Sequence, residues 1–122
     1  MPILEVEIVC EPGTSPPLVL AQRLADAVGR VLHTPPGRTW VRVRTLASTD
    51  YAENETRVDP KELPVFVNVL KAHPPEGIEL AAEVVALTST IASVVGVCAE
   101  RVHVKYAPAA VGRQAFGGKL VE

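Results

Sequence analysis

The sequence predicts an α+β fold that is built as a tandem βαβ repeat. Two alternating apolar segments each follow a proline, and these prolines, Pro2 and Pro64, lie 62 positions apart. After each segment come a proline-bearing loop, an apolar helical pattern and a second alternating segment. Parallel strands joined by a crossover helix form a βαβ unit, and two such units can share one sheet. We therefore expect a four-stranded mixed sheet with two helices on one face.

The first unit covers about residues 1–61. Proline is tolerated at the first residue of a strand, so Pro2 is compatible with a strand that begins at once. Ser15 followed by Pro16 predicts the N-terminus of a helix, and the apolar residues after them form one helical stripe. The expected elements are a strand over 1–9, a helix over 18–32, a strand over 40–46 and a polar stretch over 47–62.

The second unit covers about residues 62–122, so one domain spans 1–122. Hydrophobic residues make up 48% of the chain, which is enough for a core. Glu79, Glu83 and Gly96 interrupt the second apolar helical pattern, which indicates a buried helix and no membrane span. The expected elements are a strand over 64–71, a loop over 73–77, a helix over 78–95 and a strand over 101–106.

The composition argues against several classes of protein. The net charge is −2 with no run of like charges, so we expect no nucleic-acid partner. The sequence shows no phosphate-binding glycine loop, no nucleophile motif and no metal-ligand spacing, so we expect no cofactor and no metal. Cys10 and Cys98 suit a reducing compartment, and Glu5 and Glu7 interrupt any signal-peptide pattern. These features predict a cytoplasmic protein.

One face of the predicted sheet carries charges of both signs, from Glu5, Glu7, Arg42, Arg44, His103 and Lys105. This face is either solvated surface or the interior of an oligomer in which the glutamates neutralise the arginines. We favour the oligomer because an isolated four-stranded sheet has two edges to protect. The two arginines could also bind a substrate carboxylate through their bidentate forks, but pairing with the glutamates is favoured.

The start of the chain, its tandem βαβ repeat and its C-terminal tail together resemble the tautomerase superfamily. This is the group of 4-oxalocrotonate tautomerase, 5-carboxymethyl-2-hydroxymuconate isomerase and macrophage migration inhibitory factor. The features that carry the resemblance are the Met1–Pro2 start, the two βαβ units, the strand 101–106 and the glycine-bearing tail 112–118. The strand and the tail look like the long-subunit branch. The resemblance implies a homotrimer around a central channel, with each site at a subunit boundary.

The resemblance also implies that Pro2 is the general base once Met1 is removed. A free α-amino group titrates at roughly 8, and nearby cations lower that value toward neutrality. One branch of the superfamily has a substrate-binding lysine before a Pro-Pro turn, where this chain has Thr34. The tyrosine and asparagine of the same branch correspond to His103 and Lys105. These differences leave a more basic pocket, which suits a small-molecule carboxylate.

The predicted site therefore has Pro2 as the catalytic residue. The predicted substrate-binding residues are Lys71, His73, His103, Lys105 and Arg113. The basic residues at the end of the third strand resemble those of superfamily decarboxylases and dehalogenases. Arg113 could close a neighbouring site, or the tail could be a hairpin in which glycines supply positive φ.

Two functions follow from this reading. The first is a cofactor-independent tautomerase or isomerase that moves a proton in a small carboxylated enol or keto compound. Its variants are hydration-type chemistry, dehalogenation and decarboxylation, which need a carboxylate or tyrosine to activate water. The second is a non-enzymatic trimeric binding protein in which Met1 blocks Pro2.

Overall fold

The computed structural model describes residues 2–122 of the chain, and it has the predicted α+β architecture. The helices are α1 (Leu20–Val31) and α2 (Gly77–Val95). The strands are β1 (Ile3–Cys10), β2 (Trp40–Ala47), β3 (Val65–Leu70), β4 (Val102–Tyr106), β5 (Ala115–Phe116) and β6 (Lys119–Leu120). Short 3-10 turns occupy Ser48–Asp50, Pro60–Glu62 and Ala99–Arg101.

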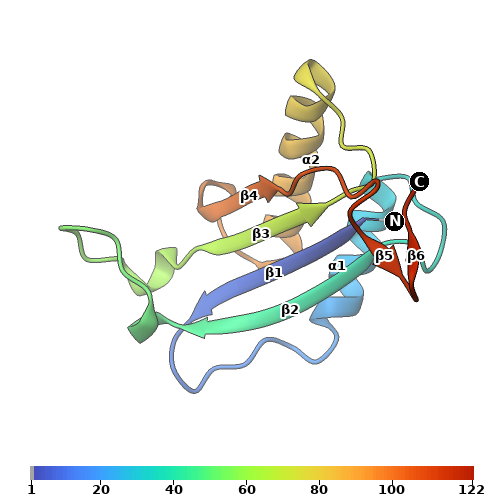
Figure 1. The fold of residues 1–122 in the computed structure, drawn as a ribbon. Coiled ribbons are helices and arrows are strands. Elements are labelled where there is room, and N and C mark those ends of the chain that lie inside the picture. Colours follow the sequence, from blue (N-terminus) through green and yellow to red (C-terminus); the bar gives the residue numbers. More distant parts are fainter. Residues whose placement is uncertain (1) are drawn as a thin grey trace.

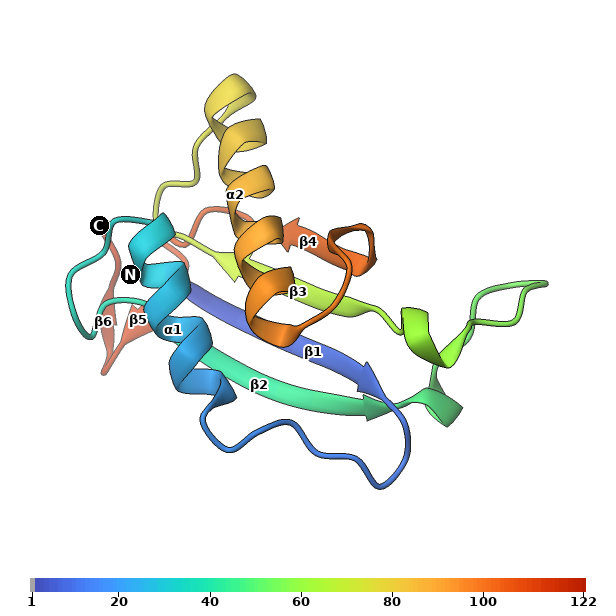
Figure 2. The same ribbon diagram turned by 180° about the vertical axis from the view of Figure 1, so that it is seen from behind.

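The four long strands form one mixed sheet in the order β2-β1-β3-β4. β1 runs parallel to β2, β3 runs parallel to β4, and β1 and β3 are antiparallel. Both helices cover the same face, and the other face is open (Figures 1 and 2). The prediction of two βαβ units that share one sheet, with both helices on one side, is confirmed.

The core lies between the sheet and the two helices. Alternate residues of β1 and β3 point toward the helices, while α1 and α2 present residues three and four positions apart. Burial of these aliphatic side chains is the main source of stability for the fold. The fully buried members of this core include Leu4, Val65, Val69, Leu24, Val28, Leu87 and Ile91.

The N-terminus of α1 differs from the prediction. The helix begins at Leu20, and Val19 occupies the cap position without a side-chain hydrogen bond. The Leu18 side chain is fully exposed, so it does not belong to the buried stripe. The reason is that Pro17 disfavours helical geometry at the residue before it, so the helix cannot run through the two prolines. The backbone N–H of Leu20 instead bonds the carbonyl of Pro17 at 3.0 Å.

α2 is buried along one face of its C-terminal half only. Its buried residues are Leu87, Ile91 and Ala92, whereas Ile78 is 90% exposed and Val85 is 66% exposed. By length and composition alone, α2 is apolar enough to cross a membrane. The prediction of a buried helix is therefore correct only for the half that packs on the sheet.

Candidate functional site

Pro2 lies at one corner of the sheet, where β1 begins. It is buried, and its carbonyl accepts a hydrogen bond of 3.0 Å from the backbone N–H of Trp40. The alternation along β1 places Pro2 on the same side as Leu4, which faces the helices. Because Ile3 pairs with Leu70, Pro2 stands opposite Lys71, one step beyond the last paired residues. Met1, whose removal was predicted, lies outside the described residues.

Three polar side chains from three elements meet at this corner. Lys71 follows β3, Tyr106 ends β4, and Glu83 lies on α2. Lys71 Nζ is 2.8 Å from Glu83 Oε1, and the Tyr106 hydroxyl donates to the other oxygen, Oε2. The Lys71 and Glu83 side chains are only 20% and 16% exposed. Burial and the bond to Glu83 raise the pKa of Tyr106, so this phenol stays a neutral hydrogen-bond donor.

The C-terminal hairpin covers the same corner from the side of β2. Phe116 packs edge to face on Trp40, with the ring centroids 5.1 Å apart. Gly117 and Gly118 form the turn between β5 and β6 with φ values of 56° and 87°, which glycine adopts readily. The predicted glycine-dependent hairpin is confirmed, and it folds onto the strand whose Trp40 bonds Pro2.

Two of the predicted substrate-binding residues lie near this corner without joining the cluster. His73 is exposed in the loop between β3 and α2. Arg113 is exposed in the turn before β5, where its backbone N–H bonds the carbonyl of Ala110 at 2.9 Å. Neither side chain has a partner among the interactions of the described residues, so both remain available to solvent.

The other two predicted residues, His103 and Lys105, point to the open face of the sheet. They line a hollow of about 320 Å³ together with Phe66 and Asn68. The Oδ1 atom of Asn68 is buried there and has no hydrogen-bond partner within the described residues 2–122. The sheet therefore separates His103 and Lys105 from Lys71 within one chain, although all three were predicted to hold one carboxylate.

The acidic and basic residues of the open face pair across β1 and β2. Arg42 is 2.8 Å from Glu5, and Arg44 is 3.5 Å from Glu7. This confirms pairing as the role of the two arginines in a single chain. Both arginine side chains are about two-thirds exposed, so each pair is worth at most about 1 kcal/mol while this face is open to water.

A second polar cluster lies at the opposite end of the sheet from Pro2. Glu53 Oε2 accepts bonds from the Tyr51 hydroxyl at 2.6 Å and from Arg101 at 2.8 Å. These two bonds, that of Tyr51 first, hold the pKa of Glu53 below its usual range. The bond to Glu53 raises the pKa of Tyr51. Within one chain, Tyr51 and Glu53 therefore lie far along the sheet from Pro2.

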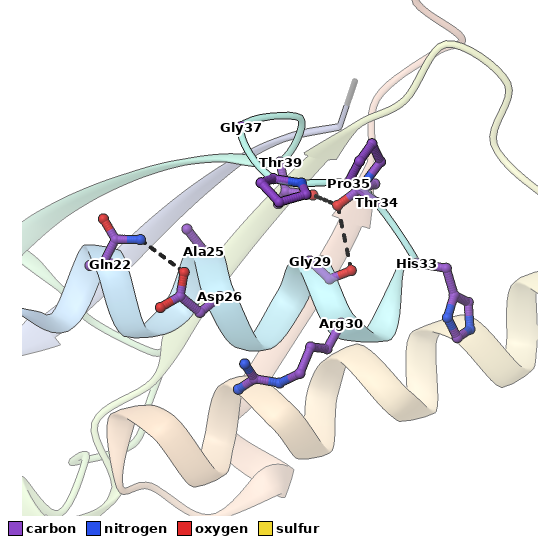
Figure 3. A pocket seen from close by; sticks show the side chains of 11 residues that line it. Gln22, Ala25, Asp26, Gly29, Arg30, His33, Thr34, Pro35, Gly37 and Thr39 are labelled. Carbon is purple, nitrogen blue, oxygen red and sulfur yellow. Dashed lines mark hydrogen bonds between the residues drawn. The ribbon is translucent and has the colours of Figure 1, made fainter.

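A larger hollow, of about 640 Å³, runs between α1 and the turn that follows it (Figure 3). Its centre is the Thr34–Thr39 hydroxyl pair, 2.5 Å apart, beside the carbonyl of Gly29. Figure 3 shows Arg30 and His33 pointing away from the threonines. The charged groups of this hollow therefore do not converge on one ligand position. Thr34, which stands before the Pro35–Pro36 turn in place of the lysine noted above, lines this hollow.

Sequence reasoning missed the roles of Glu83 and Tyr106. One signal was present, because Glu83, Leu87 and Ile91 recur at every fourth residue and form one helical stripe. A carboxylate on the buried stripe of a helix requires a partner. The sequence did not indicate which residue would be that partner, since Lys71 and Tyr106 come from two different strands.

The sheet order, the two helices on one face and the hairpin form a fold that several solved structures share. Among solved structures, the chain is similar to macrophage migration inhibitory factor from Oncomelania hupensis, with a TM-score of 0.74 and 19% identity over 100% of this chain and 83% of that one. It is also similar to a fused 4-OT symmetric trimer, with a TM-score of 0.71 and 21% identity over 97% and 94% of the two chains. Pt0534 inactivated by 2-oxo-3-pentynoate matches with a TM-score of 0.72 and 15% identity over 97% and 95%.

No protein-family model matches the chain, and no curated protein matches it by sequence. The similarity therefore concerns the fold. It confirms the fold that the resemblance implied, without specifying the long-subunit branch.

Proposed function

We propose that this protein is a cofactor-independent tautomerase that moves a proton within a small carboxylated enol or keto compound. Pro2, freed by removal of Met1, is the general base. The observation that carries the proposal is the position of Pro2, buried at the start of β1 and opposite Lys71. A secondary amine with a cation nearby would have a lowered pKa and would be unprotonated in a useful fraction at neutral pH.

The proposed active form is a homotrimer. The fused 4-OT structure with this fold is a symmetric trimer. Here the open face carries paired charges and a buried, unpartnered Asn68 oxygen, which are features of a surface that another subunit covers. In a trimer, His103 and Lys105 of one protomer would complete the Pro2 site of its neighbour. That arrangement would reunite the basic residues that the sheet separates within one chain.

The proposed substrate carries a carboxylate. His73 and Arg113 remain free near Pro2, while Lys71 is held by Glu83. Pt0534, which shares the fold, is inactivated by 2-oxo-3-pentynoate, a 2-oxo acid. Basic side chains around an amine base would hold the carboxylate and stabilise the dienolate as charge develops on it.

Three measurements test this function. Intact mass spectrometry of protein from its native host should show loss of methionine, and full retention would rule out Pro2 as a base. Ketonisation of phenylenolpyruvate and 2-hydroxymuconate should then be detectable, and Pro2→Ala should lower the rate about 100-fold or more. Pro64→Ala is the matched control, because Pro64 starts the equivalent strand of the second unit. A folded Pro64 variant should keep the parent rate. Equal rates for the Pro2 variant and the parent would contradict the mechanism.

The second candidate function is a trimeric binding protein in which Met1 blocks Pro2. The observation that favours it is the Lys71–Glu83 pair, since a lysine already paired with a carboxylate is less available to a substrate. Retained methionine, a trimer by light scattering and no turnover of either enol would together support this function.

A further inference from the structure

In the hydrogen-bonded cluster of Lys71, Glu83 and Tyr106, only Lys71 was expected to touch a substrate. Two of its members end neighbouring strands, and Glu83 bridges them from α2. We infer that Lys71 and Glu83, whose ion pair follows the strand end opposite Pro2, together set the proton affinity of the Pro2 nitrogen at the proposed tautomerase site through their two opposing charges. This inference rests on the proposed function, because it requires a free Pro2 amine.

The geometry fixes the positions of both charges. Lysine has a flexible four-carbon stem, so its ammonium takes up a fixed position only when a partner holds it. Glu83 Oε1 holds Lys71 Nζ at 2.8 Å, and its other oxygen is held by Tyr106, so the carboxylate is itself fixed from two sides. All three side chains are at least partly buried, which limits screening by solvent.

The charges of the cluster act on Pro2 in opposite directions. The Lys71 ammonium disfavours a second positive charge and lowers the pKa of Pro2, whereas the Glu83 carboxylate favours that charge and raises it. Tyr106 is neutral, so the cluster carries one positive charge on Lys71 and one negative charge on Glu83. Removing either charge should therefore shift the pKa of Pro2, and the sign of the shift identifies which charge was lost.

Other charged groups of this end of the molecule are more exposed or face elsewhere. Glu5, Arg42 and Lys105 project from the open face of the sheet, on the side away from the helices. The remaining groups are exposed on the flanking segments: Arg30 and His33 at the end of α1, Arg38 in the turn before β2, His73, Glu76 and Glu79 in the loop before α2 and its first turn, and Arg113, Lys119 and Glu122 in the tail.

The experiment titrates Pro2 directly. Protein labelled with ¹⁵N-proline is treated with methionine aminopeptidase and shown by intact mass to begin at Pro2. The ¹⁵N shift of its terminal nitrogen is then followed against pH in the full-length chain. The set comprises the parent, Glu83→Gln, Lys71→Met, the double variant and Glu79→Gln, which makes the same charge change on the exposed preceding turn of α2.

Glu83→Gln should lower the pKa of Pro2 by about 0.5 to 1 unit, and Lys71→Met should raise it by a similar amount. The double variant should return close to the parent, and Glu79→Gln should leave the parent value in place. Shifts of the same sign in the two single variants, or no shift in either, would overturn the inference. If one single variant does not fold, the other two variants still test the inference. The folded single variant must shift the pKa of Pro2 in its predicted direction, and the double variant must lie close to the parent.

This titration does not depend on turnover. A protein that shows the opposite shifts but converts no enol would retain the inference while the proposed reaction fails. A protein that converts the enols with a Pro2-dependent rate but shows no opposite shifts would retain the reaction while the inference fails. Where turnover is present, the rising limb of kcat/KM against pH should move with the titrated value.

Discussion

Truncation of two leucines that the sequence places on one stripe should have very different effects on stability. Leu24 has no exposed surface and packs in the core between α1 and the sheet, whereas Leu18 is fully exposed before the helix begins. A buried leucine cut to alanine loses the transfer free energy of its methyl groups and leaves a cavity, and such changes cost about 2–5 kcal/mol. We expect Leu24→Ala to lower the free energy of unfolding by about 3 kcal/mol, and Leu18→Ala to lower it by less than about 0.5 kcal/mol.

Urea unfolding followed by circular dichroism measures this difference. With a slope of about 1.5 kcal/mol per molar urea, Leu24→Ala should lower the midpoint by about 2 M, while Leu18→Ala should leave it almost unchanged. All samples need the same protein concentration, because subunit association shifts the apparent stability. Equal losses at the two positions would refute the helix boundary and the core described here.

Three further predictions concern the helix end, the hairpin and the second polar cluster. Gly96→Ala should cost about 1 kcal/mol in urea unfolding, because φ at this helix end is 86° while the space for a methyl group is open. Phe116→Ala should change the emission of Trp40, the only tryptophan, and should lower the unfolding free energy by about 1 kcal/mol. Glu53→Gln should destabilise the protein at pH 7, with a gap to the parent that closes as pH falls. The lowered pKa of Glu53 means that its contribution is complete above its unfolded pKa of roughly 4.3 and is lost as pH falls through its folded value, so the unfolding midpoints of the two proteins should converge as the pH is lowered.

Each of these predictions has an outcome that contradicts it. An unchanged Gly96 variant would show that the backbone there is not constrained to positive φ. Unaltered tryptophan emission would place Phe116 away from Trp40. A difference in midpoint between Glu53→Gln and the parent that does not narrow as the pH is lowered would mean that the Glu53 side chain stabilises the fold by packing, with no contribution from its charge.

The secondary structure was predictable because its signals are local. The alternation of β1 and the spacing of apolar residues in α2 require only the sequence, and Gly96 marks a helix end at the residue where the chain turns. The start of α1 was predicted wrongly because Ser15 and Pro16 resemble a helix start, whereas Pro17 excludes one. The preference of Ser15 and Pro16 for a helix start was overridden by the backbone restriction that Pro17 imposes on the residue before it.

The site was predictable in part. Pro2 and Lys71 were expected near each other, and the register between β1 and β3 places them opposite. The pairing of Glu83 with Lys71 and Tyr106 was not expected, because it joins residues 12 and 23 positions from the glutamate on three elements. Alternation along the strand predicts that His103 points to the open face of the sheet. That the sheet then separates His103 from Lys71 within one chain became clear only from the assembled sheet.

The corner that holds Pro2 also limits how the protein can be handled. The backbone of Pro2 bonds Trp40, and the C-terminal hairpin packs on the same tryptophan, so both ends of the chain lie close together (Figure 1). An affinity tag on the N-terminus would turn the Pro2 nitrogen into an amide, and one on the C-terminus would crowd the same corner. A tag placed within the arm at 54–57, at the far end of the sheet, would leave this corner unmodified. Recombinant material tagged at either end is therefore poorly suited to any screen for activity.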